Sequence, residues 1–115
     1  MDEDAIRRLI AAFNAAWNAH DLDAALDLCT PDVVFESTDP APDGRRFEGR
    51  DAVRTAWQPV FAEEQGRFDA EELIVAGDRV VQRWRFDWGR GRVRGVDVIT
   101  ISGGLVKEKL AYVKG

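Results

Sequence analysis

The sequence has few of the residues that build metal and redox sites. Its 115 residues include one cysteine, one histidine, one tyrosine and one methionine. A lone cysteine, Cys29, excludes an internal disulfide and a cysteine-based zinc site, and one histidine cannot complete the usual metal-ligand shells. No glycine-rich loop follows an expected strand and opens a helix, so no nucleotide phosphate site is predicted. We therefore expect neither a metal nor a cofactor.

An excess of basic residues is also missing. There are 16 basic and 21 acidic residues, for a net charge of −5, which argues against nucleic acid or a membrane surface as a partner. Six arginines lie between Arg79 and Arg94, and we expect them to form a solvated face beside acidic neighbours. No apolar run approaches membrane-spanning length, and the acidic start Met1–Asp4 is unlike a secretory leader. We therefore expect a cytoplasmic protein.

The sequence is 45% hydrophobic, enough for one globular domain with a real core over residues 1–115. Apolar spacing predicts an amphipathic helix over Asp4–Asn18 and a second helix capped by Asp21, whose apolar face carries the lone cysteine as an inert core thiol. A third helix is predicted to open at Gly49–Asp51. Pro59 should end or kink it near Trp57, because proline lacks the amide proton that a helix needs.

The remaining segments are predicted to be strands and turns. Short strands are expected at Val33–Glu36 and Arg45–Glu48, and four longer ones follow Gly66 as an antiparallel meander. Helices first and a meander afterwards is an α+β pattern, with the helices packed on one face of a curved sheet. The four longer strands are expected at Arg67–Val75, Arg79–Trp88, Val93–Ile101 and Leu105–Val113.

One carboxylate interrupts the apolar face of a predicted strand. In Val93–Ile101, alternation places Asp97 on the same side as the apolar residues Val93, Ile99 and Ile101. An unpaired carboxylate is costly to bury, so Asp97 should be protonated, be paired, or line a cavity that a ligand or water fills.

The turn into the last strand predicts the first set of neighbours for Asp97. If Gly103–Gly104 is a two-residue loop, Asp97 lies opposite Leu110, with Glu108 and Tyr112 diagonal to it on the same face. This register makes Glu108 and Tyr112 the expected catalytic helpers of Asp97.

The preceding turn leaves two interpretations open. If Gly89–Arg90 forms a two-residue type II′ turn, Asp97 lies opposite Gln82, on a face shared with Trp84 and Phe86. A three-residue loop would instead place Asp97 opposite Arg83, as a plain cross-strand ion pair. We prefer the first because it pairs apolar residues with apolar residues.

The order of four short motifs resembles the nuclear transport factor 2-like superfamily, especially its SnoaL-like polyketide cyclase and ketosteroid isomerase branches. The resemblance implies a cone of curved antiparallel sheet of four to six strands, closed by three N-terminal helices as in the cystatin-like folds. It also implies an apolar pocket and frequent homodimers formed through the outer sheet face. The motifs are Ala16–Asp23, Thr30–Phe35, Phe47–Val53, and Gly95–Ile101 with the hairpin Gly103–Val106.

Only part of the ketosteroid isomerase site has a counterpart in this sequence. Asp97 matches the strand acid that helps to hold the oxyanion, but the partner phenol falls at Phe13, which has no hydroxyl. The catalytic base falls near Ser37, and serine alone does not abstract a proton at neutral pH. Steroid isomerisation is therefore not expected.

Two functional hypotheses follow. The first is an isomerase-like, cyclase-like or lyase-like enzyme in which Asp97, aided by Glu108 and Tyr112, performs acid–base chemistry on an apolar carbonyl compound. The second is a non-catalytic module that binds an apolar ligand or forms a dimer. Either would hold a small apolar or aromatic molecule. The side chains expected to line its pocket are Phe13, Trp17, Phe35, Trp57, Phe61, Trp84, Phe86 and Leu110.

Overall fold

The computed structural model describes residues 1–115 as three helices and six strands. The helices are α1 (Glu3–Asn18), α2 (Leu22–Asp27) and α3 (Arg50–Phe61). The strands are β1 (Cys29–Glu36), β2 (Arg46–Glu48), β3 (Arg67–Ala76), β4 (Arg79–Asp87), β5 (Arg92–Ser102) and β6 (Leu105–Val113).

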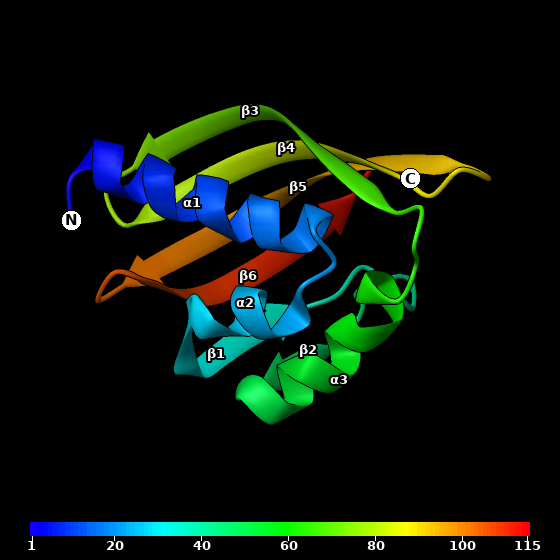
Figure 1. Ribbon diagram of the computed structural model, residues 1–115, viewed down its shortest axis with the longest axis horizontal. Helices are drawn as coiled ribbons and strands as arrows, with labels where there is room; N and C mark the ends of the chain where they lie inside the picture. The colour runs from blue at the N-terminus through cyan, green and yellow to red at the C-terminus, as the bar shows by residue number, and fades with distance from the viewer.

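All six strands form one curved sheet in the order β2-β1-β6-β5-β4-β3. Figure 1 shows α1 lying along the long strands, while α2 and α3 lie beside β1 and β2. The expected α+β architecture with three helices on a curved sheet is confirmed. One pairing is parallel: β1 runs in the same direction as its neighbour β6, and the other pairs are antiparallel.

The helix signals in the sequence are largely confirmed. As expected, Asp21 caps α2, by accepting a hydrogen bond from the Ala24 amide. Asp2, which the sequence analysis did not identify, caps α1 through the Ala5 amide. Two expectations need correction. Pro59 does not end α3 near Trp57, since the helix continues to Phe61. Pro59 lies two residues before that end, and its missing amide removes only one main-chain hydrogen bond. Cys29 is not on a helix but begins β1, where it is buried.

The β4–β5 register matches the two-residue turn at Gly89–Arg90. The Trp88 amide donates to the Gly91 carbonyl across the turn, and Asp97 lies opposite Gln82. The alternative in which Asp97 faces Arg83 is wrong, because Arg83 lies opposite Val96.

The β5–β6 register begins as expected and then shifts. Ser102 pairs with Leu105, but Lys107 is an extra residue in the ladder, so Thr100 pairs with Glu108. A bulge of one residue moves every later side chain of the strand to the opposite face of the sheet. Asp97 therefore lies opposite Ala111, and the expected pairing with Leu110 is wrong.

The core lies between the helices and the concave face of the sheet. It combines the apolar stripe of α1 with Val53, Trp57 and Phe61 of α3 and inward residues of the strands. Lys109, Gln82 and Asp97 are the buried polar residues on this face. None of the helices is both long and apolar enough to cross a membrane.

Candidate functional site

A cavity of about 640 Å³ opens between α3, β1 and the inner face of β4–β6. Its walls are largely aromatic, and the exposed residues Asp39, Pro40 and Arg45 lie where it meets solvent. This volume is in the range that holds a small organic molecule.

Five of the eight side chains expected to line a pocket border this cavity: Trp17, Phe35, Trp57, Trp84 and Phe86. Phe13 instead borders an adjoining cavity of about 20 Å³, deeper in the core. Phe61 packs on Trp17, with ring centroids 4.4 Å apart, and borders neither cavity. Leu110 is on the outer face because of the bulge at Lys107, so its expected place in the pocket is wrong.

Asp97 faces inward and is 4% exposed, yet it borders only the small cavity. Its neighbour is Lys109 of β6, whose Nζ lies 3.6 Å from Asp97 Oδ2. Lys109 borders both cavities, so its side chain lies between the carboxylate and the larger space. The contact brings together two charges that are both nearly removed from water.

Lys109 is the residue that sequence reasoning missed. It is 8% exposed, and its ammonium lies 5.0 Å from the ring centroids of both Trp17 and Phe35, a distance at which a cation is attracted to an aromatic face. If the β5–β6 register set by the two-residue turn at Gly103–Gly104 continued without a bulge, Lys109 would point to the outer face of the sheet. The one signal in the sequence was the need of a buried Asp97 for a cation.

Burial raises the pKa of Asp97 above its ordinary value of 3.8, because the charged form loses its hydration. The positive charge of Lys109 acts in the opposite direction, and so does the nearby indole N–H of Trp84. Asp97 Oδ1 makes no hydrogen bond. The carboxyl group therefore retains a proton more readily than an exposed aspartate does.

Two amide side chains close the deep end of the site. Asn14 Nδ2 of α1 donates to Gln82 Oε1 at 2.6 Å, and Gln82 Nε2 donates back to Asn14 Oδ1 at 3.2 Å. One turn later, Asn18 Nδ2 donates to the Phe68 carbonyl on β3, and the Phe68 amide donates to Asn18 Oδ1. These contacts tie α1 to the strands, and they position the inner face on which Asp97 lies.

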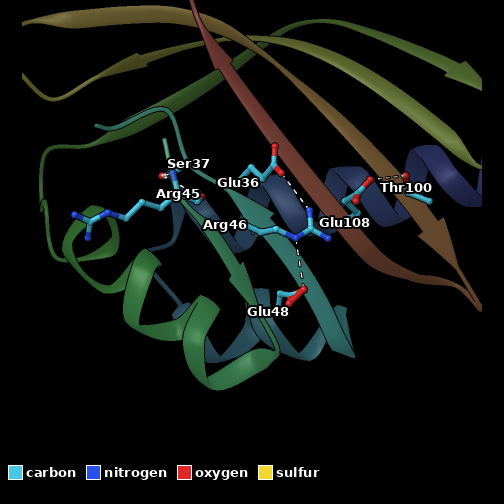
Figure 2. A network of polar contacts seen from close by, with 7 residues as sticks. All are labelled: Glu36, Ser37, Arg45, Arg46, Glu48, Thr100 and Glu108. Atoms are coloured by element: carbon cyan, nitrogen blue, oxygen red, sulfur yellow. Dashed lines mark hydrogen bonds and ion pairs between the residues drawn. The ribbon is translucent and has the colours of Figure 1, made fainter. Parts of the chain in front are cut away.

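Glu108 and Tyr112 do not accompany Asp97. Both lie on the outer face, where Tyr112 is 54% exposed and Glu108 Oε1 lies 3.5 Å from the Thr100 hydroxyl. Figure 2 shows Glu108 directed toward Thr100, away from the neighbouring pair of Glu36 and Arg46. Their expected place beside Asp97 is wrong, because the bulge at Lys107 reverses the facing of β6.

The arginines of the meander form the solvated face that the sequence predicts. On the outer side of the sheet, Arg83 pairs with Glu72 at 2.8 Å, and Arg85 pairs with Asp69 at 2.8 Å. Arg94 lies 3.4 Å from Glu71. The structure gathers no group of three His, Cys, Asp or Glu side chains that would hold a metal.

The model of the SnoaL-like domain matches residues 10–109, which is most of the chain. The chain belongs to the SnoaL-like family. This family and its nuclear transport factor 2-like relatives include isomerases and cyclases. No curated protein matches this SnoaL-like chain.

Solved structures agree with this assignment. A nuclear transport factor 2-like protein of unknown function from Mesorhizobium loti is 37% identical, with a TM-score of 0.88 over 100% of this chain and 97% of that one. A SnoaL-like protein of unknown function from Burkholderia thailandensis is 22% identical, with a TM-score of 0.83 over 100% and 99% of the two chains. The second likeness shows the fold alone.

Proposed function

We propose that this protein binds a small, flat, largely apolar carbonyl compound in the aromatic cavity, and that Lys109 and Asp97 perform acid–base chemistry on it. The observation that carries the proposal is a buried ammonium that borders an aromatic cavity and has a carboxylate 3.6 Å behind it. Isolated charges are rarely buried without a partner, and perturbed ionisable groups gather at functional sites.

The walls of the cavity support a flat apolar ligand. Trp17, Trp57 and Phe35 pack on one another edge to face, with centroid separations of 4.8 Å and 5.6 Å, which leaves ring faces and edges as contact surfaces. Phe86 stacks on Trp88 at 5.9 Å on the far side. A planar ring system would replace water against these side chains at little conformational cost.

The buried cation supports an oxygen on that ligand. Lys109 borders the large cavity and is the one cation of its wall that is buried. A carbonyl oxygen close to its ammonium would accept a charge-assisted hydrogen bond from it.

The acid–base step follows from this placement. The ammonium of Lys109 gives a proton to the carbonyl oxygen of the ligand, and the amine that this leaves takes the proton of the adjacent C–H, so that an enol forms and the ammonium is restored. Asp97 does not border the large cavity, so it acts behind Lys109 by exchanging protons with the amine. This proposal retains Asp97 as an essential group and makes Lys109 the group that contacts the ligand.

The test uses 2-acetonaphthone, a flat methyl ketone, as the probe. Quenching of tryptophan fluorescence should report saturable binding, and the methyl protons should exchange with D₂O faster than with an equal amount of denatured protein. Asp97→Asn should retain binding and lose the exchange. Binding that fails in the folded wild-type protein contradicts the proposal.

A second candidate is binding without turnover. It is favoured because Asp97 does not border the large cavity, and because Ser37, which does, falls near the position where the resemblance to ketosteroid isomerases implies the base. This candidate predicts saturable binding of 2-acetonaphthone with no exchange above background in any variant. Exchange that depends on Asp97 would exclude it.

For the partner, we propose a homodimer through the outer face of the sheet. An apolar row crosses four adjacent strands there, since Ile74 pairs with Val81, Val81 with Val98, and Val98 with Leu110. Ile74 at one end is 50% exposed. Contiguous exposed apolar side chains rimmed by charged residues are typical of protein interfaces.

A further inference from the structure

Lys109 differs from the other two lysines in its surroundings. The chain has only three lysines, and Lys107 and Lys114 are exposed while Lys109 is buried against the cavity. Its amine is the only lysine or cysteine nucleophile on the cavity wall, because the thiol of Cys29 does not border the cavity. A ligand in the cavity would therefore meet one reactive nitrogen.

The nitrogen of Lys109 also has a proton acceptor beside it. Asp97 Oδ2 is 3.6 Å away, longer than a strong charge-assisted hydrogen bond, and Asp97 has no hydrogen-bond donor on its other oxygen. Passing one proton from the ammonium to the carboxylate would neutralise two buried charges at once and leave a free amine lone pair. A desolvated lysine next to an acid–base partner is the usual arrangement of an amine that attacks carbonyl carbon.

We propose that Lys109 forms an imine with aromatic or other apolar aldehydes and ketones that enter the cavity. This inference rests on the proposed function, and it adds a covalent bond to it. Its evidence is the juxtaposition of a buried amine, an aromatic cavity and a carboxyl group, all described above.

The reaction balances with the groups at hand. After the ammonium has protonated Asp97, the amine attacks the carbonyl carbon, and the oxygen takes a proton from the attacking nitrogen to give a carbinolamine. The nitrogen lone pair then forms the C=N bond while the C–O bond breaks, and Asp97 returns its proton to the departing oxygen. One water leaves, no oxidant or reductant is used, and the product is an iminium next to an ionised Asp97.

The surroundings favour the iminium over the free carbonyl. Its positive charge replaces the ammonium charge 5.0 Å from the centroids of Trp17 and Phe35, so the cation–aromatic attraction is retained. The ionised carboxylate of Asp97 pairs with it. The apolar wall disfavours the water that would hydrolyse it.

The test traps the imine by reduction. The wild-type protein is incubated with 2-naphthaldehyde and sodium cyanoborohydride, its intact mass is followed with time, and the labelled peptide is identified after proteolysis. We expect one adduct at Lys109, formed at least about tenfold faster than adducts at Lys107, Lys114 or the N-terminus, since a held carbonyl reacts at a high effective concentration. 2-Naphthalenemethanol, which has no carbonyl, should compete.

Two variants complete the experiment. Lys109→Arg retains the positive charge next to Asp97 and removes the nucleophile, so it should lose the fast adduct. Lys107→Arg is the matched surface control and should label as the wild type does. Circular dichroism reports whether each variant is folded. The peptide map of the wild-type protein tests the proposal even without a folded variant, because it compares Lys109 with the other two lysines of the same molecule.

The outcomes separate the two proposals. Equal labelling of all lysines, or an unchanged fast adduct in folded Lys109→Arg, overturns the imine. Saturable binding of 2-naphthalenemethanol without preferred labelling of Lys109 also overturns the imine and leaves the proposed binding function intact. No binding of either naphthalene probe overturns both.

Discussion

Lys109 and Asp97 face each other across β6 and β5, with Nζ 3.6 Å from Oδ2 and both residues less than 10% exposed. The pair borders an aromatic cavity instead of solvent. A buried ion pair generally stabilises a protein no more than well-packed apolar residues of the same volume do. Its presence in a small core therefore points to a function and not to stability.

Removing one member of this pair should be costly. Lys109→Met leaves Asp97 buried without its cation, and we expect a loss of about 3 kcal/mol in the free energy of unfolding. The double variant Lys109→Met/Asp97→Asn should be destabilised by less than the two single variants added together. We expect the difference to be at least about 1 kcal/mol in the free energy of unfolding. Urea unfolding of the four proteins measures this coupling. Lys107→Met, on the surface, should change stability by less than about 0.5 kcal/mol.

The raised pKa of Asp97 predicts a pH dependence of stability with a definite sign. Between 3.8 and the raised value, the folded protein holds a proton that the unfolded chain has released. The contribution of Asp97 to the free energy of unfolding therefore falls as pH rises from about 3.8 through that window. Wild-type stability minus that of Asp97→Asn, from urea unfolding in a pH series, should decrease with pH. An increase would mean that Lys109 stabilises an ionised Asp97.

Cys29 should be unreactive in the folded protein. It is fully buried, and burial raises the pKa of its thiol to about 12, so hardly any thiolate exists at pH 8. We expect no reaction with Ellman's reagent in buffer and one thiol per chain in denaturant. Because the chain has a single cysteine, the absorbance reports this site alone. Rapid reaction of the native protein would show that α2 or β1 opens.

Gly95→Ala should destabilise the fold by collision. An added Cβ would lie 2.1 Å from the Tyr112 carbonyl oxygen and 2.6 Å from the Trp84 ring, so main chain and cavity wall would both have to move. We expect a loss of about 1–3 kcal/mol, measured by thermal or urea unfolding. Gly103→Ala is a control that changes backbone strain only, since its φ is +58° and nothing lies within 4 Å. A smaller loss for Gly95→Ala than for the control would contradict the prediction.

Val98→Arg should dissociate the proposed homodimer. Val98 lies in the middle of the outer apolar row, between Val81 and Leu110, so a charge there meets its own copy across a symmetric interface. Sedimentation velocity at micromolar concentration should give a dimer for the wild type and a monomer for the variant. Arg83→Lys, on the same face in an ion pair with Glu72, is the matched control and should remain dimeric. A wild-type monomer contradicts the homodimer.

The sequence by itself determined the elements and one half of the site. Periodicity is local, so it located α1. The cap Asp21 acts within one helical turn, and the glycine-first turn at Gly89–Arg90 set the register that places Gln82 opposite Asp97. Alternation along β5 also placed Asp97 on the buried face. These features depend on residues only a few positions apart.

The tertiary structure alone decided which residues of β6 meet Asp97. The turn at Gly103–Gly104 predicts Leu110 there, but β6 also pairs with β1, and the Val106 amide donates to the Leu28 carbonyl more than seventy residues earlier. Val106 then packs inward next to Cys29, Lys107 bulges out, and Lys109 and Ala111 replace Leu110 and Tyr112 on the inner face. A turn rule describes two strands, whereas a third strand and a buried carboxylate that needs a cation decide this register together.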